Sequence, residues 1–300
     1  MNLDAFEAHL RERDRSPVTV RRYCQEMQRF AVWFEQTNGQ ALTHTAITGR
    51  DVRDYREYGQ AVARLMPGTI NARLAAIRAY AAWLVESGQL QSNPAERVKM
   101  IDEQPLAPKA LDRRQLAALE RELERSVNAA TTQAARFMRT RDQAIIMLLA
   151  NSGLRVAELC ALTAADVVIG ERSGKVIVSR GKGNRRREVP LNIEARRPLA
   201  AWFGYREDTM QENDPLFCDH QGHALKPWGV QHQLKEYGRR AGIEVTPHIL
   251  RHTFAKSLAD AGIRAEHIAA LLGHSNLETT RRYTLPTGRD LAAAVERLEG

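Results

Sequence analysis

Two histidines and an arginine lie within five residues of one another in the stretch TPHILRHT, at His248, Arg251 and His252. Thr246 followed by Pro247 is typical of a helix start, so we expect His248 in the first turn and Arg251 on a neighbouring face. An imidazole, a guanidinium and free backbone N–H groups at a helix N-terminus suit an anion, especially a phosphate. Ordinary hydrogen-bonded histidines would give the same pattern.

The spacing of His248 and His252 is also half of a zinc-hydrolase signature. That signature needs a glutamate directly after the first histidine as general base, and this chain has Ile249 there. Arg251, one turn from a bound cation, would repel it. The three cysteines are too far apart for a Cys-x-x-Cys motif or a disulfide framework: Cys24, Cys160 and Cys218. We therefore expect no metal and three inert thiols.

A second candidate is the stretch NSGLRVAEL, residues 151–159. Its Arg155 comes just after Gly153, a glycine that breaks one helix before the next begins. Glu158 lies three residues further on, close enough to orient Arg155 or to pair with it. A surface ion pair on a helix is the commoner explanation of such a spacing.

A third candidate is the turn Gly181–Lys182–Gly183, which joins two strand-like segments. Lys182 is flanked by four arginines: Arg180, Arg185, Arg186 and Arg187. This run suits insertion towards a phosphate backbone, and a lysine at the tip could donate a proton, although a solvated turn would look similar.

The last candidate is LLGHSNLETTRRYT, residues 271–284. It predicts a helix that ends at Gly273, then His274, and a capping box that opens the next helix. Tyr283 ends that second helix beside two arginines. A tyrosine on a helix is by default a packing or surface residue, and nothing local marks Tyr283 as a nucleophile.

The elements that must position these residues fall into two groups. Apolar residues at helical spacing predict helices from residue 17 onwards, over 50–65 and over 69–86, with Arg73 and Arg78 off the apolar face. Residues 1–92 therefore form a small helical bundle. Three prolines mark residues 93–110 as a linker.

Residues 111–300 form the second predicted domain. It contains a strong helix over 141–150, strands over 166–169, 175–180 and 185–190, and helices after residue 192. The fold class is mainly α with a small antiparallel β-sheet, in an α+β arrangement.

Composition and charge narrow the class of protein. The 300 residues are 43% hydrophobic and 27% charged, which is typical of a globular protein. The longest apolar run, residues 144–150, is too short to cross a bilayer, and the N-terminus has no signal-peptide pattern, so we expect a cytoplasmic protein. The net charge of +8 is spread over both halves, which favours a polyanion partner contacted by both.

Taken in order, these motifs resemble those of a known family. GLRxxEL at 153–159, the hairpin Lys182, HxLRHTFA at 248–255, LLGH at 271–274 and a tyrosine nine residues beyond are similar to the tyrosine site-specific recombinases, the Xer and phage-integrase proteins. The motifs span residues 150–285. The helical region before them resembles the family's core-binding, SAM-like domain, and the region after residue 110 its catalytic domain.

The resemblance implies a mechanism. Tyr283 attacks a DNA phosphate to give a 3′-phosphotyrosyl link, and strands exchange through a Holliday junction without ATP, metal or other cofactor. The implied catalytic set is Arg155, Lys182, His248, Arg251, His274 and Tyr283, with Glu158 and His252 in supporting roles. Arg155, Arg251 and His274 bind the phosphate oxygens, Lys182 protonates the leaving oxygen, and His248 assists proton removal from Tyr283. Implied DNA contacts are Arg73, Arg78, Arg180, Arg185, Arg186, Arg187, Arg281 and Arg282.

The implied partners are double-stranded recombination sites, bound on the nucleoid by a homotetramer or by a heterotetramer with a paralogue. Two alternatives stay open: a type IB topoisomerase, and a DNA-binding regulator with a helix-turn-helix over 261–273. The presence of all six catalytic residues favours an enzyme over a regulator. Leu285 and Pro286 stand where many relatives have a histidine, and the short helical tail 290–298 leaves docking in cis or in trans open.

Overall fold

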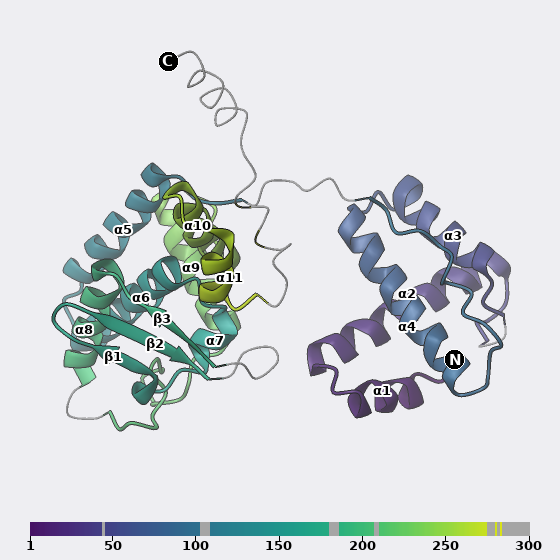
Figure 1. Cartoon of the computed structure of the whole chain (residues 1–300), viewed down its shortest axis with the longest axis horizontal. Helices are drawn as coiled ribbons and strands as arrows, with labels where there is room; N and C mark the ends of the chain where they lie inside the picture. Colours follow the sequence, from purple (N-terminus) through teal and green to yellow (C-terminus); the bar gives the residue numbers. More distant parts are fainter. Residues whose placement is uncertain are drawn as a thin grey trace, which may run out of the picture. The chain divides into compact units, whose positions relative to one another are not determined.

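The computed structural model describes residues 1–43, 46–102, 109–179, 186–206 and 210–274, together with residues 280 and 283. The chain divides into two compact units, Met1–Pro105 and Leu106–Gly300 (Figure 1). The boundary between them lies in the stretch 93–110 that the sequence marks as a linker. Each unit has a hydrophobic core of its own, so each can position its surface residues independently of the other.

The regular secondary structure described in the N-terminal unit is helical. Its elements are α1 (Leu3–Glu12), α2 (Pro17–Asn38), α3 (Gly49–Glu57), the π-helical turn η1 (Tyr58–Val62) and α4 (Pro67–Glu86). Edge-to-face aromatic pairs fill the core between them, with the rings of Phe6 and Tyr80 5.1 Å apart and those of Phe30 and Tyr55 also 5.1 Å apart.

The single helix predicted over 50–65 is wrong in its second half. The α-helix ends at Glu57, and the chain continues as η1 to Val62. Arg64 then takes a left-handed backbone conformation with φ of 47°, and Met66 is extended because Pro67 disfavours helical backbone at the residue before it. The apolar spacing is present, but the backbone cannot continue through this corner.

The C-terminal unit surrounds a small sheet with helices. Its elements are α5 (Arg113–Asn128), α6 (Gln133–Ser152), α7 (Val156–Cys160), the 3-10 turn η2 (Ala164–Asp166), β1 (Val167–Ile169), β2 (Gly174–Val178), β3 (Arg187–Pro190), α8 (Ile193–Arg206), α9 (Pro227–Ala241), α10 (Pro247–Asp260) and α11 (Ala265–Leu272).

Helix α6 runs through the middle of this unit. Residues 144–150 are all buried, so the helix is apolar on every side there. The helix predicted over 141–150 is confirmed, but it begins earlier, where the Thr132 side chain accepts a hydrogen bond from the backbone of Ala135. The more polar first turns hid this start from a search for apolar periodicity.

The sheet has the order β1-β2-β3 and is antiparallel. Val176 lies opposite Val167 and Val189, and all three are buried, so one face of the sheet packs on the core. The three predicted strands are confirmed with different ends, since β1 and β3 begin later than predicted and β2 begins and ends earlier. The predicted α+β fold class is confirmed as well. The turn between β2 and β3, residues 180–185, lies outside the described residues.

The three cysteines are free. Burial raises the pKa of the Cys160 thiol to about 11, so this thiol stays protonated and unreactive at neutral pH. Among the helices that the structure describes, none is both long enough and apolar enough to cross a membrane.

Candidate active site

The turn between α6 and α7 holds the first candidate residues. Gly153 ends α6 with φ of 62°, in the left-handed region that glycine accepts without strain. A Cβ at this position would lie 2.6 Å from the side chains of both Leu272 and Phe254, so the glycine also allows α10 and α11 to approach. Arg155 follows as the N-cap residue of α7, as the sequence predicts.

Glu158 is a buried carboxylate that binds this turn together. It accepts hydrogen bonds from the backbone N–H of Arg155 at 2.8 Å and from Nη1 of Arg155 at 2.9 Å. Burial raises the pKa of Glu158, but hydrogen bonds from Arg187 and from the Arg155 backbone outweigh it, so the pKa lies below its ordinary value. The predicted pairing of Arg155 and Glu158 is confirmed. It belongs to a buried network, not to an isolated surface pair.

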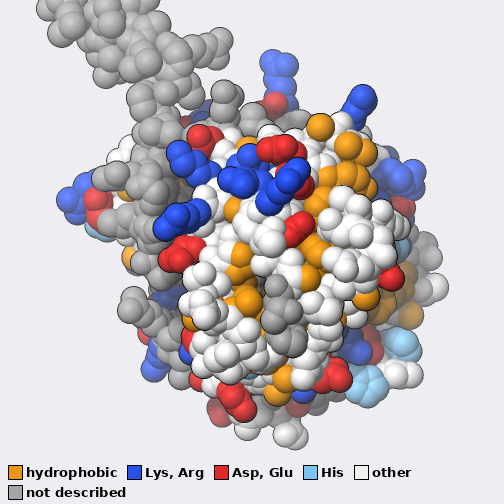
Figure 2. Space-filling view, turned by 90° about the vertical axis from the view of Figure 1, so that its right-hand side faces the viewer, with side chains coloured by type: hydrophobic (Ala, Val, Ile, Leu, Met, Phe, Trp, Pro, Cys, Tyr) orange, Lys and Arg blue, Asp and Glu red, His pale blue; other side chains and the backbone are white. Residues whose placement is uncertain are grey.

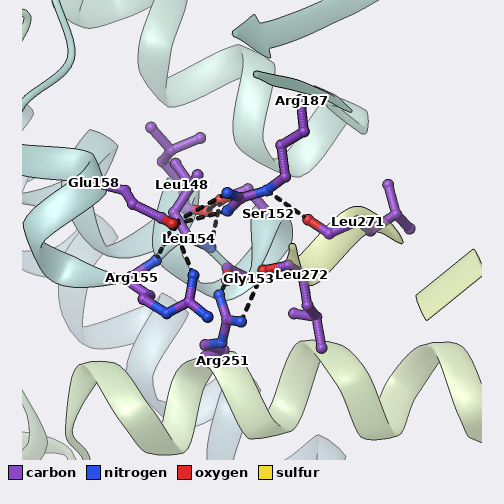
Figure 3. A network of polar contacts seen from close by, with 10 residues as sticks. All are labelled: Leu148, Ser152, Gly153, Leu154, Arg155, Glu158, Arg187, Arg251, Leu271 and Leu272. Atoms are coloured by element: carbon purple, nitrogen blue, oxygen red, sulfur yellow. Dashed lines mark hydrogen bonds and ion pairs between the residues drawn. The ribbon is translucent and has the colours of Figure 1, made fainter. Parts of the chain in front are cut away.

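Helix α10 contributes His248 and Arg251. Thr246 caps the helix and Pro247 occupies its first position, as predicted, which leaves His248 exposed in the first turn. Arg251 is only 5% exposed. Its Nη1 donates to the carbonyl of Gly153 at 2.5 Å and its Nη2 to that of Leu272 at 2.8 Å, so it joins the ends of α6 and α11 (Figure 3).

Arg251 is a crowded cation. Burial and, after it, the neighbouring positive charge of Arg155 together lower the pKa of its guanidinium to about 10. The group is still protonated at neutral pH. Two guanidiniums so close together favour an anion between them, because a bound anion relieves their mutual repulsion.

A cavity of about 850 Å³ opens beside these residues. Arg155, His248 and Arg251 line it, as the prediction of a common phosphate site requires. Helix α9 lines the same cavity with three polar residues that the sequence analysis missed: Gln231, Lys235 and Arg239. Their spacing of four residues places them on one helix face, and that spacing was the available signal.

Tyr283 lies close to α10. It is 8% exposed and packs with Ala255, Ile268 and Leu272. Its hydroxyl oxygen contacts Nδ1 of His252. The ring of His252 meets that of His248 edge-on, with 4.1 Å between the centroids, which links the tyrosine to the cavity wall.

This contact revises the expectation for the two histidines. The family resemblance implied that His248 assists proton removal from Tyr283 and that His252 has a supporting role. The described side chains instead bring His252 against the phenol, because residues four apart on a helix share one face and Tyr283 packs over the later turn.

His274 follows the C-terminal end of α11. Gly273 ends this helix with φ of 65°, as predicted, and Nδ1 of His274 lies 2.8 Å from the hydroxyl of Thr280. The predicted capping box at Ser275 and Glu278 lies outside the described residues. Arg251 thus joins the C-terminal ends of two helices. Arg155 follows shortly after the end of α6, and His274 follows shortly after the end of α11.

Several predicted residues lie outside the described part of the chain: Lys182, Arg180, Arg185, Arg281 and Arg282. Arg186 is described and exposed, 4.0 Å from Glu188. Arg187 differs from the prediction. It lies on β3, two residues before the buried Val189, so its side chain points to the core side of the sheet and pairs with Glu158.

The two predicted DNA contacts of the N-terminal unit also have partners within the protein. Arg78 donates to the carbonyls of Ala95 and Val98 and so fixes the segment after α4. Arg73 donates to the Tyr55 hydroxyl at 3.2 Å, and its Nε lies 3.4 Å from Glu26. These bonds hold the fold together, and a part in DNA binding remains a prediction for both.

A hollow that Arg73 borders has the residue types that read DNA. This hollow beside α2 is lined by Gln25, Gln28, Arg29, Val32 and Gln36, with Trp33, Tyr55, Tyr58 and Arg73 around them. Glutamine and arginine side chains can each make paired hydrogen bonds to base edges. Figure 2 shows Lys and Arg gathered on one face of the molecule, with Asp and Glu beside them. That face is therefore mixed in charge.

Within the described ranges, no three His, Cys, Asp or Glu side chains gather as a possible metal site. The site as described is a cationic pocket lined by three arginines, a lysine and a histidine, with a tyrosine hydroxyl linked to it through His252. Such a pocket suits a phosphate group and a phenolic nucleophile.

Two family models match the sequence. The model of the phage integrase family matches residues 118–288, and the model of the phage integrase N-terminal SAM-like domain matches residues 3–88. The chain belongs to the phage integrase family. The predicted resemblance to tyrosine recombinases is thereby confirmed.

Relatives of this phage integrase family member match along nearly the whole chain. Tyrosine recombinase XerC of Myxococcus xanthus is 31% identical over 301 residues, covering 96% of this chain and 94% of the relative. Tyrosine recombinase XerA of Thermococcus kodakarensis is 34% identical over 298 residues, covering 98% and 94%.

Solved structures share the fold at lower identity. The XerH site-specific recombinase in a pre-cleavage complex with its difH substrate superposes with a TM-score of 0.74 at 20% identity, covering 98% of this chain and 84% of that one. A lambda integrase dimer bound to a core site gives a TM-score of 0.69 at 17% identity, covering 96% and 95%.

Proposed function

We propose that this chain is a site-specific DNA recombinase that cuts and rejoins duplex DNA through a 3′-phosphotyrosyl intermediate. The observation that carries the proposal is the convergence of Arg155, His248 and Arg251 on one cavity, with the hydroxyl of Tyr283 one histidine away. Family membership and relatives matched over nearly the full length support it.

Cleavage begins with the phosphate in the cationic pocket. Arg155 and Arg251 would donate hydrogen bonds to the two non-bridging oxygens, whose negative charge grows as the phosphorus becomes five-coordinate. Each terminal nitrogen of Arg251 donates one N–H to a backbone carbonyl. The second N–H of each nitrogen would therefore donate to the substrate. His274 would add a further donor.

The nucleophile must lose its proton as it attacks. A phenol has an ordinary pKa of about 10, so Tyr283 needs a base or a cationic field near neutral pH. His252, which contacts the hydroxyl, would accept this proton. His248, which lines the cavity, would contact the phosphate. The bond from phosphorus to the 5′-oxygen breaks as the bond to Tyr283 forms, and Lys182 would protonate the departing oxygen.

Rejoining reverses these steps. The phosphotyrosyl bond keeps the energy of the broken bond, so the 5′-hydroxyl of a partner strand can attack it and restore the tyrosine without ATP. Two such exchanges pass through a Holliday junction. We expect four copies on two DNA sites, either identical or shared with a paralogue, acting in the cytoplasm on the nucleoid, and no cofactor. The DNA contacts predicted around the catalytic pocket remain Arg180, Arg185, Arg186, Arg281 and Arg282.

The N-terminal unit, predicted as residues 1–92, would bind the same duplex. We propose that the row of glutamines and Arg29 on α2 faces the DNA, because its residue types suit base edges and its side chains surround an open hollow. The linker over 93–110 and the catalytic domain over 111–300 complete the predicted organisation.

The test uses a duplex selected by the protein from random sequences, nicked close to the cleavage site so that the short fragment leaves. The intact chain should form a covalent adduct that survives denaturation, with and without EDTA. Tyr283→Phe should bind the duplex and form none. Tyr205→Phe, a matched control in the same unit, should form the adduct normally. An adduct with Tyr283→Phe would refute the assignment, and relaxation of supercoiled DNA without recombinant products would favour a topoisomerase.

A further inference from the structure

All three guanidinium nitrogens of Arg187 donate hydrogen bonds within the protein. Its Nη1 and Nη2 donate to the two carboxylate oxygens of Glu158 at 3.0 and 2.7 Å, and its Nε donates to the carbonyl of Leu271 at 3.0 Å (Figure 3). The side chain is 11% exposed. A paired, two-bond contact of this kind fixes the direction of both groups as well as their distance.

The register of the sheet determines this orientation. Arg187 lies opposite Val178, which is buried, and shares the inner face of β3 with Val189. Arg186, one residue earlier, points the other way, and its side chain is 67% exposed. Two adjacent arginines of the same hairpin therefore have different surroundings.

The other side of the Arg187 guanidinium lies against Gly273. A Cβ on Gly273 would be 2.9 Å from Nη1 of Arg187, so only a glycine lets the arginine lie this close. His274 follows directly. Arg187 thus touches the carboxylate that holds Arg155 and the chain end that carries His274.

We propose that Arg187 is a positioning residue for DNA cleavage: it fixes Arg155 through Glu158 and fixes His274 through the C-terminal end of α11. This inference rests on the proposed function, and it replaces the sequence-based expectation that Arg187 contacts DNA. The charges around Glu158 support this role. Glu158 is a buried anion near Arg155, Arg187 and Arg251. Without Arg187, only Arg155 would fix the orientation of its carboxylate.

The experiment separates binding from cleavage in single turnover on the nicked duplex. Arg187→Ala should lower the cleavage rate at saturating protein ~10- to 100-fold, as loss of supporting contacts does elsewhere, and change DNA affinity less than ~3-fold. Arg186→Ala removes the same charge from the adjacent, exposed position. It should weaken DNA binding and reduce the salt dependence of binding, and it therefore shows what loss of a DNA contact alone does.

Two further measurements keep the proposal testable if Arg187→Ala folds poorly. Arg187→Lys keeps the charge but loses the paired contact, so its saturated rate should fall between those of the intact chain and the alanine variant. The pKa of Glu158, followed by carbon NMR of the labelled carboxyl, should rise in Arg187→Lys and stay unchanged in Arg186→Ala.

The outcomes are distinct. An affinity of Arg187→Ala weakened as much as that of Arg186→Ala, together with an unchanged saturated rate of Arg187→Ala, would make Arg187 a DNA contact and overturn the proposal. A full rate in Arg187→Lys with an unshifted pKa of Glu158 would also overturn it. If the intact chain itself forms no adduct, the proposed function has failed instead.

Discussion

Each unit of this protein buries one glutamate between two arginines, and the two groups differ in what surrounds them. In the N-terminal unit, Glu26 lies 2.7 Å from Arg29 and 3.4 Å from Arg73, beside aromatic rings of the core. In the C-terminal unit, Glu158 lies 2.9 Å from Arg155 and 2.7 Å from Arg187.

The difference lies in the third cation and the cavity. Arg251 adds a further positive charge near Glu158, and the group borders an 850 Å³ cavity that can admit an anion. Among the described residues, Glu26 pairs with no third arginine: it anchors Arg73 against Tyr55, and both of these residues border the smaller hollow beside α2. The same ion pairing therefore holds side chains in place in one unit and, with an excess of positive charge beside a larger cavity, creates a site that suits an anion in the other.

The largest effect that separates the two units should come from removing one arginine in each. Arg251→Ala should lower the saturated cleavage rate by about 10²- to 10³-fold, because a donor to the transition-state charge is lost. Arg78→Ala also removes an arginine bonded to two carbonyls, and it should lower the stability of its unit by ~1–3 kcal/mol while the saturated rate stays within about 3-fold. Equal losses of cleavage rate in both variants would contradict the difference between a catalytic and a structural arginine.

The glutamates should differ in the same direction by a smaller amount. Glu158→Gln should slow saturated cleavage about 10- to 100-fold, whereas Glu26→Gln should leave it nearly unchanged. The two variants are compared in single-turnover reactions on the same nicked duplex. A slow Glu26→Gln enzyme would mean that the N-terminal pair acts in catalysis after all.

Glu158 also gives this comparison a pH dependence. Its pKa is below the ordinary value of 4.5, so its carboxylate stabilises the folded unit fully above pH 4.5. That contribution is lost as the pH falls through the lowered pKa. Thermal unfolding between pH 6 and pH 3 should show a shallower acid-side decrease in Glu158→Gln than in the intact chain. Parallel curves would contradict the assigned pairing.

The smallest effect concerns the histidines of α10. His252→Gln should slow cleavage ~10-fold at pH 7, and the loss should become smaller in alkaline solution, because hydroxide can then accept the proton that His252 accepts in the intact chain. His267→Gln, an exposed change on α11, serves as the control. If His248→Gln shows this pH recovery and His252→Gln does not, His248 is the base and the resting contact of His252 is structural.

Local signals predicted much of this fold. Ser16 with Pro17, Thr246 with Pro247, and the glycines at 153 and 273 each mark a helix end, because capping and left-handed backbone depend on a few adjacent residues. The catalytic candidates Arg155, His248 and Arg251 were identified by sequence motifs, and they do line one cavity.

Other features depend on contacts between distant residues. The orientation of Arg187 follows from strand register, for which the alternation of Arg187, Val189 and Leu191 was the only hint. The contact between His252 and Tyr283 joins residues 31 positions apart and cannot be derived from helical spacing. The π-helical turn that begins at Tyr58 is followed by the left-handed backbone of Arg64. The apolar spacing of the sequence indicates neither feature.

The two carbonyls that hold Arg251 have a consequence for when the protein can cut DNA. One belongs to Gly153, 98 positions away in sequence, and the other to Leu272, 21 positions away. Both are available only after α6, α10 and α11 have packed together. In a nascent or partly unfolded chain, Arg251 therefore lacks the contacts that orient it. Fraying of α11 alone would remove one of them, the carbonyl of Leu272. DNA cleavage by this protein is thus conditional on complete folding of the C-terminal unit.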